Sequence, residues 1–189
     1  HKTITSGFIM ETIELKNILP EAFKQLDKVE SDVWHQSMTF HKKKIYLIKA
    51  VSGAGKSSLC GYLYGDRKDY QGIISFDGAN IAALNHKDWV DIRRNHLSLI
   101  FQDLKLFPEL TALENIQIKN NLTHHKKKKE IINWLDRLGL KEHIHQPASK
   151  LSFGQQQRVA FIRALCQPLD FILLDEPVSH LDQKNADLM

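Results

Sequence analysis

The sequence has little cysteine and no long apolar run. Its two cysteines, Cys60 and Cys166, lie far apart and fit neither a CxxC pair nor the Cys/His spacing of a metal site. This excludes a disulfide framework and favours two reduced, buried thiols. No apolar run approaches the roughly 20 residues that a membrane-spanning helix needs. The first fifteen residues lack the uninterrupted apolar core of a signal peptide, so we expect no secretory leader.

The sequence also lacks a strong excess of charge of either sign. Lys and Arg number 26 against 22 Asp and Glu, and the formal net charge of +4 neither demands nor excludes an anionic partner. The composition is 42% hydrophobic and 25% charged, which is ordinary for a globular protein. A chain of 189 residues forms one domain, or one domain with a small subdomain, and buries about 70% of its unfolded surface without staples.

Apolar runs and turn residues predict strands that alternate with helices. The run 43–51 is apolar and β-branched and stops at a glycine-containing turn, which predicts a buried strand that feeds a loop. The segment 57–65 has helical spacing and ends at Gly65, a candidate C-cap. Further strands are predicted at 12–18, 34–40, 72–78, 96–103 and 169–177, and further helices at 85–95, within 111–140 and at 151–166.

The stretch "AVSGAGKSSL" begins at Ala50 and resembles a phosphate-binding loop. The usual pattern is Gly, four residues, then Gly-Lys-Ser/Thr. Gly55, Lys56 and Ser57 fit it, while Ala50 stands where the first glycine belongs. If φ at Ala50 were positive, alanine would cost roughly 1–3 kcal/mol of strain. The residues that would touch phosphate are all present, which favours a working loop over a chance match.

A strand, a glycine loop, a lysine and a helix together form a phosphate cradle. Backbone N–H groups and the positive helix N-terminus hold phosphate oxygens. Lys56 would reach the β- and γ-phosphates, and the Ser57 hydroxyl would bind Mg²⁺. The predicted nucleotide-binding residues of this loop are Ser52, Gly53, Ala54, Gly55, Lys56, Ser57 and Ser58.

The segment "FILLDEP" is an apolar strand that ends in two carboxylates. It would deliver Asp175 and Glu176 to the C-terminal edge of a sheet, where open α/β sheets bind ligands. Asp175 could hold the metal's water shell, and Glu176 could accept a proton from an attacking water. The alternative is a buried strand that ends in a solvated acidic turn.

A third motif, "LSFGQQQRVAFIRAL", places Ser152 before Asp175 in the chain. With the phosphate loop and "LLDEP", it resembles the ATP-binding cassette (ABC) ATPases, whose signature reads LSGGQ. The segment "SLIFQDLKLFPELTALENI" is similar to the family's Q-loop, which makes Gln102 its glutamine and a metal and catalytic contact. "SHLD" is similar to the D-loop and contains Asp182. The resemblance runs from about residue 11 to residue 182.

The resemblance implies that two such domains pair head to tail. Each ATP would lie between the Lys56 loop of one chain and the signature of the other, and the partner-chain contacts would be Ser152, Gly154 and Gln155. Ser152 and Gly154 stand at a predicted helix N-terminus, which is an anion site in its own right. The signature departs from the family at Phe153, where glycine is usual; an aromatic side chain there could point away from the phosphate.

The resemblance also implies the fold class. It is α/β, with a P-loop NTPase core and a mostly parallel sheet, an antiparallel β subdomain and an inserted helical subdomain. The whole of 1–189 would be one ABC nucleotide-binding domain, with the helical subdomain at about 105–165 and the C-terminal part missing. The sequence stops at Met189, before the family's switch histidine. Losing one positioned polar group costs roughly 10²–10³ in rate, so we expect ATP binding with poor turnover.

Adenine recognition and permease contact are weakly marked. The family stacks adenine on an aromatic ring before the phosphate loop; Phe23 is the candidate, while Trp34 is expected in the core. After the Q-loop glutamine, Leu106, Phe107 and Leu110 are either local core or a groove for a permease helix. Histidine pairs at 124–125 and in 143–145 are expected at the surface rather than around a metal.

These residues predict an ATP-hydrolysing subunit that powers a membrane transporter through ATP-driven dimerisation. Its partners would be ATP with Mg²⁺, a second nucleotide-binding domain and a transmembrane permease, and no nucleic acid is expected. The chain would be cytoplasmic, held at the inner face of the membrane by the permease. It looks most like the bacterial lipoprotein-release, macrolide-export and cell-division subgroup. The alternatives are a non-transport ABC ATPase of DNA repair or translation, and an ATP-binding module without hydrolysis.

Overall fold

The computed structural model describes residues 9–25 and 30–176. The chain divides into two compact units, residues 1–97 and residues 98–189. The predicted D-loop residue Asp182 lies outside the described residues. Within those residues, no helix is both long enough and apolar enough to cross a bilayer.

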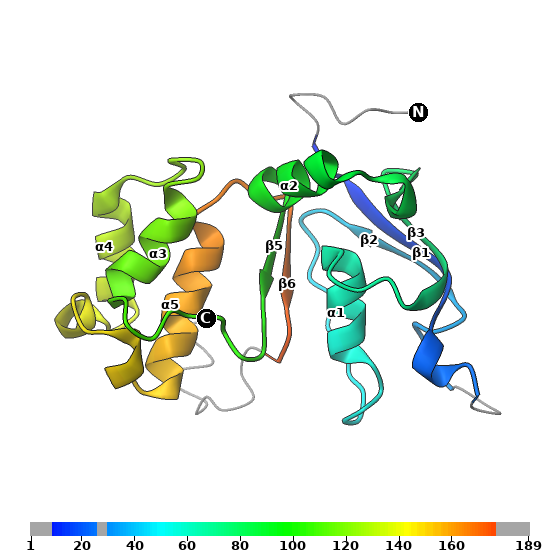
Figure 1. The fold of residues 1–189 in the computed structure, drawn as a ribbon, viewed down its shortest axis with the longest axis horizontal. Coiled ribbons are helices and arrows are strands. Elements are labelled where there is room, and N and C mark those ends of the chain that lie inside the picture. Colours follow the sequence, from blue (N-terminus) through cyan, green and yellow to red (C-terminus); the bar gives the residue numbers. More distant parts are fainter. Residues whose placement is uncertain (1–8, 26–29, 177–189) are drawn as a thin grey trace. The chain divides into compact units, whose positions relative to one another are not determined.

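An antiparallel sheet of four strands forms the base of the first unit, with the order β2-β1-β3-β4 (Figure 1). The central strand β1 buries alternate side chains, including Ile13 and Leu15. Ile13 pairs with Phe40 on one side and Phe76 on the other, so three apolar side chains share one face. The strands are β1 (Thr12–Pro20), β2 (Ser37–His41), β3 (Tyr70–Phe76) and β4 (Ala79–Asn80).

Two helices of the first unit pack against strand β3 and end where local signals predict. Helix α1 (Lys56–Tyr64) ends at Gly65, whose φ of 76° is left-handed, and contacts β3 through the rings of Tyr62 and Tyr70 at 4.9 Å. Helix α2 (His86–Asn95) begins with a capping box, and its Trp89 meets Phe76 edge to face. Short 3₁₀ turns are η1 (Glu21–Phe23) and η2 (Ile81–Ala83).

The strand predicted at 43–51 is not formed, which corrects the sequence prediction. No strand of either described sheet includes these residues. Ile45 is 99% exposed and Leu47 77% exposed, so the segment is not buried either. Apolar and β-branched residues make a strand only when a neighbouring backbone accepts their hydrogen bonds, and the described chain gives this segment no such neighbour.

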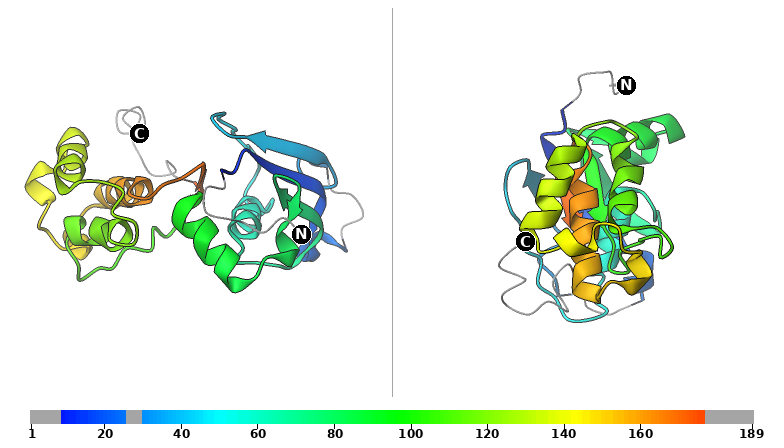
Figure 2. Two further views of the ribbon diagram at one scale, coloured as in Figure 1. Left: turned by 90° about the horizontal axis from the view of Figure 1, so that it is seen from above. Right: turned by 90° about the vertical axis from the view of Figure 1, so that its left-hand side faces the viewer.

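The described part of the second unit contains three helices, strand β6 (Phe171–Leu174) and all of strand β5 (Leu97–Ile100) except its first residue, Leu97. Strands β5 and β6 pair and run in the same direction (Figure 1). Two views show α3, α4 and α5 packed together (Figures 1 and 2). The helices are α3 (Ala112–Asn120), α4 (Lys128–Arg137) and α5 (Phe153–Leu165), with 3₁₀ turns η3 (Lys141–His143) and η4 (Ala148–Lys150).

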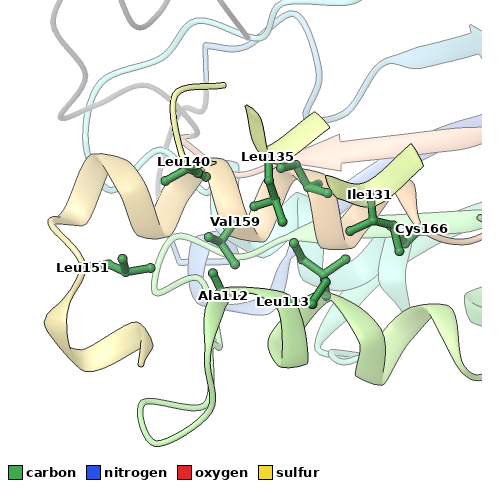
Figure 3. Close-up of a cluster of buried hydrophobic side chains, with 10 residues drawn as sticks. Ala112, Leu113, Ile131, Leu135, Leu140, Leu151, Val159 and Cys166 are labelled. Carbon is green, nitrogen blue, oxygen red and sulfur yellow. The ribbon is translucent and has the colours of Figure 1, made fainter. Parts of the chain in front are cut away.

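One apolar cluster holds the three helices together (Figure 3). Ile116 of α3, Ile131 of α4 and Val159 of α5 are each fully buried in it. Leu106 packs against this cluster as local core, while Phe107 is 51% exposed. The helical region expected within 111–140 is confirmed, Leu106 belongs to the local core, and a groove for a permease helix at Phe107 stays a prediction.

Two burial predictions need correction. Cys166 is fully buried, but Cys60, on α1, is only half-buried; both are thiols. The apolar run of β6 predicts a strand that passes through a sheet centre, yet its first three residues are half-buried and Leu174 is 41% exposed. A strand with β5 as its one described neighbour leaves much of its surface uncovered, which accounts for this exposure.

Candidate functional site

The phosphate loop, residues 50–57, has the backbone conformation that its glycines predict. Gly53 has φ of 79° and Gly55 has φ of 89°, both in the left-handed region that favours glycine. Gly55 is the N-cap of α1, and no side chain caps this helix start. Ser, Thr, Asp and Asn are the preferred N-cap residues, because their side chains accept a hydrogen bond from a backbone N–H of the first turn. A helix start without a side-chain cap suits an anionic ligand, because the positive end of the helix can bind one.

Ala50 does not strain the loop. It is not among the residues with positive φ, so its methyl group carries none of the cost that a left-handed alanine would have. The departure from the usual pattern is therefore a substitution at a position where the backbone does not need glycine.

The Lys56 side chain folds back across the loop. Its Nζ donates to the carbonyl oxygens of Ala50 at 2.9 Å and Val51 at 3.1 Å. The ammonium group is thereby held beside the loop rather than extended into water. Because these partners are neutral carbonyls, charged phosphate oxygens at the same place would form stronger hydrogen bonds with it.

Arg67 contacts Ser58, a link that the sequence did not predict. Arg67 Nη1 donates to Ser58 Oγ at 2.8 Å, and its Nε donates to Asp69 at 2.9 Å. The hydrogen bond from Arg67 lowers the pKa of Asp69 below its usual value. Ser58 was predicted only as a nucleotide contact, and it also anchors the chain that follows α1. No motif marks this pair, because the contact depends on the turn after Gly65.

Two aromatic residues pack beside the phosphate loop. Trp34 is 5% exposed, and its indole Nε1 donates to the carbonyl oxygen of Ala54 at 3.0 Å. Phe23 is half-buried and meets Trp34 edge to face, with ring centroids 6.2 Å apart. The expectation that Trp34 lies in the core is confirmed, and its indole N–H forms a hydrogen bond with the phosphate loop. Phe23 lies in the same cluster, and its role in stacking adenine stays a prediction.

The predicted catalytic carboxylates follow β6 at the same sheet edge as the predicted Q-loop glutamine. The Asp175 N–H donates to the Ile100 carbonyl at 3.1 Å, which fixes Asp175 beside the end of β5. Ile100 is the last residue of β5 and comes two residues before Gln102 in the sequence. Asp175 is 9% exposed, whereas Gln102 and Glu176 are exposed. Glu176 has φ of 52°, an uncommon conformation for a non-glycine residue and one that gathers at functional sites.

Helix α5 holds the segment that follows Gln102. Leu104 and Lys105 both have positive φ, at 58° and 47°. Arg163 of α5 donates to the carbonyl oxygen of Leu104 at 2.5 Å and of Lys105 at 2.7 Å. Two consecutive left-handed residues are costly, and the fixed fork of a guanidinium suits two adjacent carbonyls. Sequence reasoning missed Arg163, although it lies on the amphipathic helix after the signature.

The signature segment forms hydrogen bonds within itself at the start of α5. Ser152 Oγ accepts from the Gln155 N–H at 3.3 Å, and Gln155 Oε1 accepts from the Ser152 N–H at 2.8 Å, which is a capping box at the start of α5. Phe153 is 41% exposed at the first position of the helix. The predicted partner-chain contacts thus lie together at one helix N-terminus, where Gly154 is half-buried.

Gln155 is also tied to His143. Nε2 of Gln155 lies 2.9 Å from Nε2 of His143, whose Nδ1 lies 2.6 Å from Oε1 of Gln146. Because amide nitrogens only donate, an imidazole with its proton on Nδ1 satisfies both contacts. His143 was expected at the surface, but it is half-buried and supports the signature capping box through Gln155.

The predicted site residues fall into two sets, one in each unit. The donor atoms predicted for a metal are the Ser57 hydroxyl, the Gln102 amide oxygen and the Asp175 carboxylate. Hard oxygen donors with a single carboxylate suit Mg²⁺, which commonly takes one or two carboxylates together with phosphate oxygens. The residues therefore fit the ion in chemistry. Among the described residues there is no cluster of three His, Cys, Asp or Glu side chains that could hold a metal.

The sequence pattern of the ABC transporter family matches residues 34–179. The chain belongs to that family. It is an ATP-binding cassette with the α/β fold of the P-loop NTPases. The motifs predict an ATP hydrolase, and this is the enzyme class of the family. A solved structure of MJ0796, titled a dimeric bacterial ABC transporter cassette, is similar to this chain with a TM-score of 0.70 and 26% identity. The match covers 93% of this chain and 78% of the MJ0796 chain. A post-hydrolysis dimer of the same cassette, with ADP and Pi, matches at 25% identity and a TM-score of 0.69.

Curated relatives confirm the predicted subgroup. The ABC transporter ATP-binding protein YtrE of Bacillus subtilis is 34% identical over 78% of this cassette and 65% of its own length. The lipoprotein-releasing system ATP-binding protein LolD of Zymomonas mobilis is 33% identical over 90% of this cassette and 75% of its own. Macrolide export and cell division ATP-binding proteins also match. This cassette thus spans about two thirds to three quarters of such ATP-binding subunits.

Proposed function

We propose that this cassette binds ATP with Mg²⁺, dimerises on it and, by hydrolysing it, powers a membrane transporter at the inner face of the membrane. The observation that supports the proposal is the phosphate loop, whose two left-handed glycines and helix start without a side-chain cap suit an anionic ligand. In LolD and MacB, the names of the relatives couple such a domain to lipoprotein release and macrolide export. We extend the transport role to this chain by that likeness.

Each residue of the site then has a defined task. The loop amides and Lys56 would hold the β- and γ-phosphates, with Lys56 exchanging its carbonyl partners for phosphate oxygens. Mg²⁺ would neutralise phosphate charge, with Ser57, Gln102 and Asp175 as the oxygen donors. Glu176 would accept the proton of the attacking water, since it is exposed at the sheet edge next to Asp175.

The signature would complete the site of a second copy. Ser152 stands at the positive N-terminus of α5, where a γ-phosphate of the partner's ATP could be received. ATP then bridges two chains, and its hydrolysis removes the bridge. Gly154 and Gln155 would contact the ATP of the partner chain together with Ser152. A transmembrane permease would be the further partner of the dimer.

The experiment uses the substitution Glu176→Gln. The variant should bind ATP and form a stable dimer in size-exclusion chromatography, while phosphate release falls by at least about 100-fold, because the amide cannot accept the proton. Glu109→Gln, at an exposed glutamate of the second unit, is the matched control and should hydrolyse like the unsubstituted chain. Hydrolysis by Glu176→Gln at the unsubstituted rate would refute the catalytic assignment.

Two alternatives give different results. Stimulation of phosphate release by DNA or ribosomes, rather than co-purification with a membrane protein, would favour a non-transport ABC ATPase. A chain that binds ATP but releases no phosphate would be a binding module. The departure of Ala50 from the usual loop pattern gives this alternative little support, because the backbone at Ala50 does not have a positive φ.

A further inference from the structure

The indole of Trp34 joins the sheet of the first unit to the phosphate loop. The backbone around Trp34 is fixed, because its N–H donates to Ser31 Oγ at 3.0 Å and the next residue, His35, donates to the Ile18 carbonyl of β1 at 3.0 Å. Trp34 as a whole is 5% exposed. Trp34 is therefore anchored on the sheet side, and its N–H reaches out to the Ala54 carbonyl at 3.0 Å.

This hydrogen bond sets the orientation of one peptide in the loop. Ala54 stands between the left-handed Gly53 and Gly55. In a trans peptide the carbonyl and the following N–H point in opposite directions. With the Ala54 carbonyl turned to Trp34, the Gly55 N–H is turned away from the indole. The ring also limits the space on its own side, since a Cβ on Gly55 would lie 2.9 Å from Cζ2 of Trp34.

A loop of this composition needs such a restraint. Val51, Ser52 and Gly53 are exposed, and glycine loses more conformational freedom on ordering than any other residue. A loop that is ordered only part of the time binds its ligand more weakly, in proportion to the competent fraction. A hydrogen bond from a fixed indole raises that fraction before the ligand arrives.

We propose that Trp34 is a positioning residue for the phosphate loop: its indole N–H, bonded to the Ala54 carbonyl, holds the loop ready to receive the phosphates of ATP. This rests on the proposed function, because it assumes that the loop binds ATP. Trp34 acts through the loop backbone and does not itself touch phosphate. The packing of Phe23 on the indole keeps the ring in place.

The test removes the N–H and keeps the ring. In the full chain, 3-benzothienylalanine at position 34 replaces Nε1 with sulfur at nearly the same shape. The dissociation constant for ATP with Mg²⁺, measured by calorimetry, should rise about five-fold, the worth of one neutral hydrogen bond. Hydrogen exchange at the Gly55 amide of the ligand-free chain should become faster. An unchanged dissociation constant would overturn the proposal, whatever happens to thermal stability.

Two further variants separate the possible failures. Trp89→Phe alters another buried tryptophan of the first unit and should lower the melting temperature while leaving ATP affinity unchanged. Lys56→Ala should weaken ATP binding strongly. The proposed function fails, and the role of Trp34 with it, in either of two cases. The unsubstituted chain does not bind ATP, or the Lys56→Ala variant binds ATP with the same affinity as the unsubstituted chain. If Lys56 matters and the benzothienyl chain binds normally, only the role of Trp34 fails.

Discussion

The starts of helices α1 and α5 are both predicted anion sites, and the chain completes them in opposite ways. At α1, Gly55 supplies no side-chain cap, and the nearby Lys56 is bonded to two loop carbonyls. At α5, Ser152 and Gln155 cap each other's N–H groups, and His143 steadies the glutamine. The first start is shaped by backbone conformation, the second by side chains.

The difference bears on how each start can serve a ligand. A helix N-terminus without a side-chain cap keeps its dipole and amides for an incoming anion. A helix N-terminus with a capping box is stable alone, and a phosphate must compete with, or add to, the cap. We therefore expect the phosphate loop to bind nucleotide in a single chain, and the signature to contribute only when a second chain brings ATP to it.

The largest effect should come from placing a methyl group in the phosphate loop. Gly55→Ala puts a side chain at φ of 89° and at 2.9 Å from Trp34, whereas Gly53→Ala, at φ of 79°, meets nothing within 4 Å. We expect Gly55→Ala to lower the free energy of unfolding by about 1–3 kcal/mol. Its ATP affinity should fall by about 100-fold, because the Ala54–Gly55 peptide can no longer keep its place.

Gly53→Ala is the matched control, with strain of about 1 kcal/mol and no clash. Urea unfolding and calorimetry measure both variants. If the two substitutions had equal effects on stability and affinity, the packing of Trp34 against the loop would have no consequence, and the contrast between the two helix starts would be weaker.

A smaller effect should come from removing the cap at the second helix start. Ser152→Ala should cost about 1 kcal/mol of stability, the usual worth of an N-cap. Thr111→Ala removes the same kind of capping box from α3 and should cost as much. Only Ser152→Ala should also weaken ATP-driven dimerisation in the Glu176→Gln background, while ATP binding to the single chain stays unchanged. Equal dimerisation by both variants would contradict a role for Ser152 in the partner's site.

The smallest effect is the expected difference in alkylation rate between the two thiols, one in each unit. Burial raises the pKa of the Cys166 thiol to about 12, so at pH 8 only about one molecule in ten thousand carries the reactive thiolate. Cys60 is half-buried on α1, and we expect iodoacetamide to modify it first, as mass spectrometry of timed samples would detect. Modification of Cys166 should rise about ten-fold per pH unit above pH 8. Faster labelling of Cys166 in the native chain would contradict the packing around α5.

Local signals predicted the parts of this fold that local energetics decide. The C-cap Gly65 and the glycines of the phosphate loop act within a few residues, so the sequence shows them directly. The strand at 43–51 was predicted wrongly because strand formation depends on a partner elsewhere in the chain. The contacts of Arg67 with Ser58 and of Arg163 with the segment after Gln102 were invisible for the same reason.

The sequence by itself determined the family, and it located the motifs on which the proposed site rests, because each motif is a short run that can be recognised without the fold. Only the tertiary structure decided that the Trp34 indole is bonded to the loop, that His143 supports Gln155, and that Ala50 is unstrained. These facts depend on which distant groups come within hydrogen-bond distance, and on a backbone angle that no residue type fixes alone.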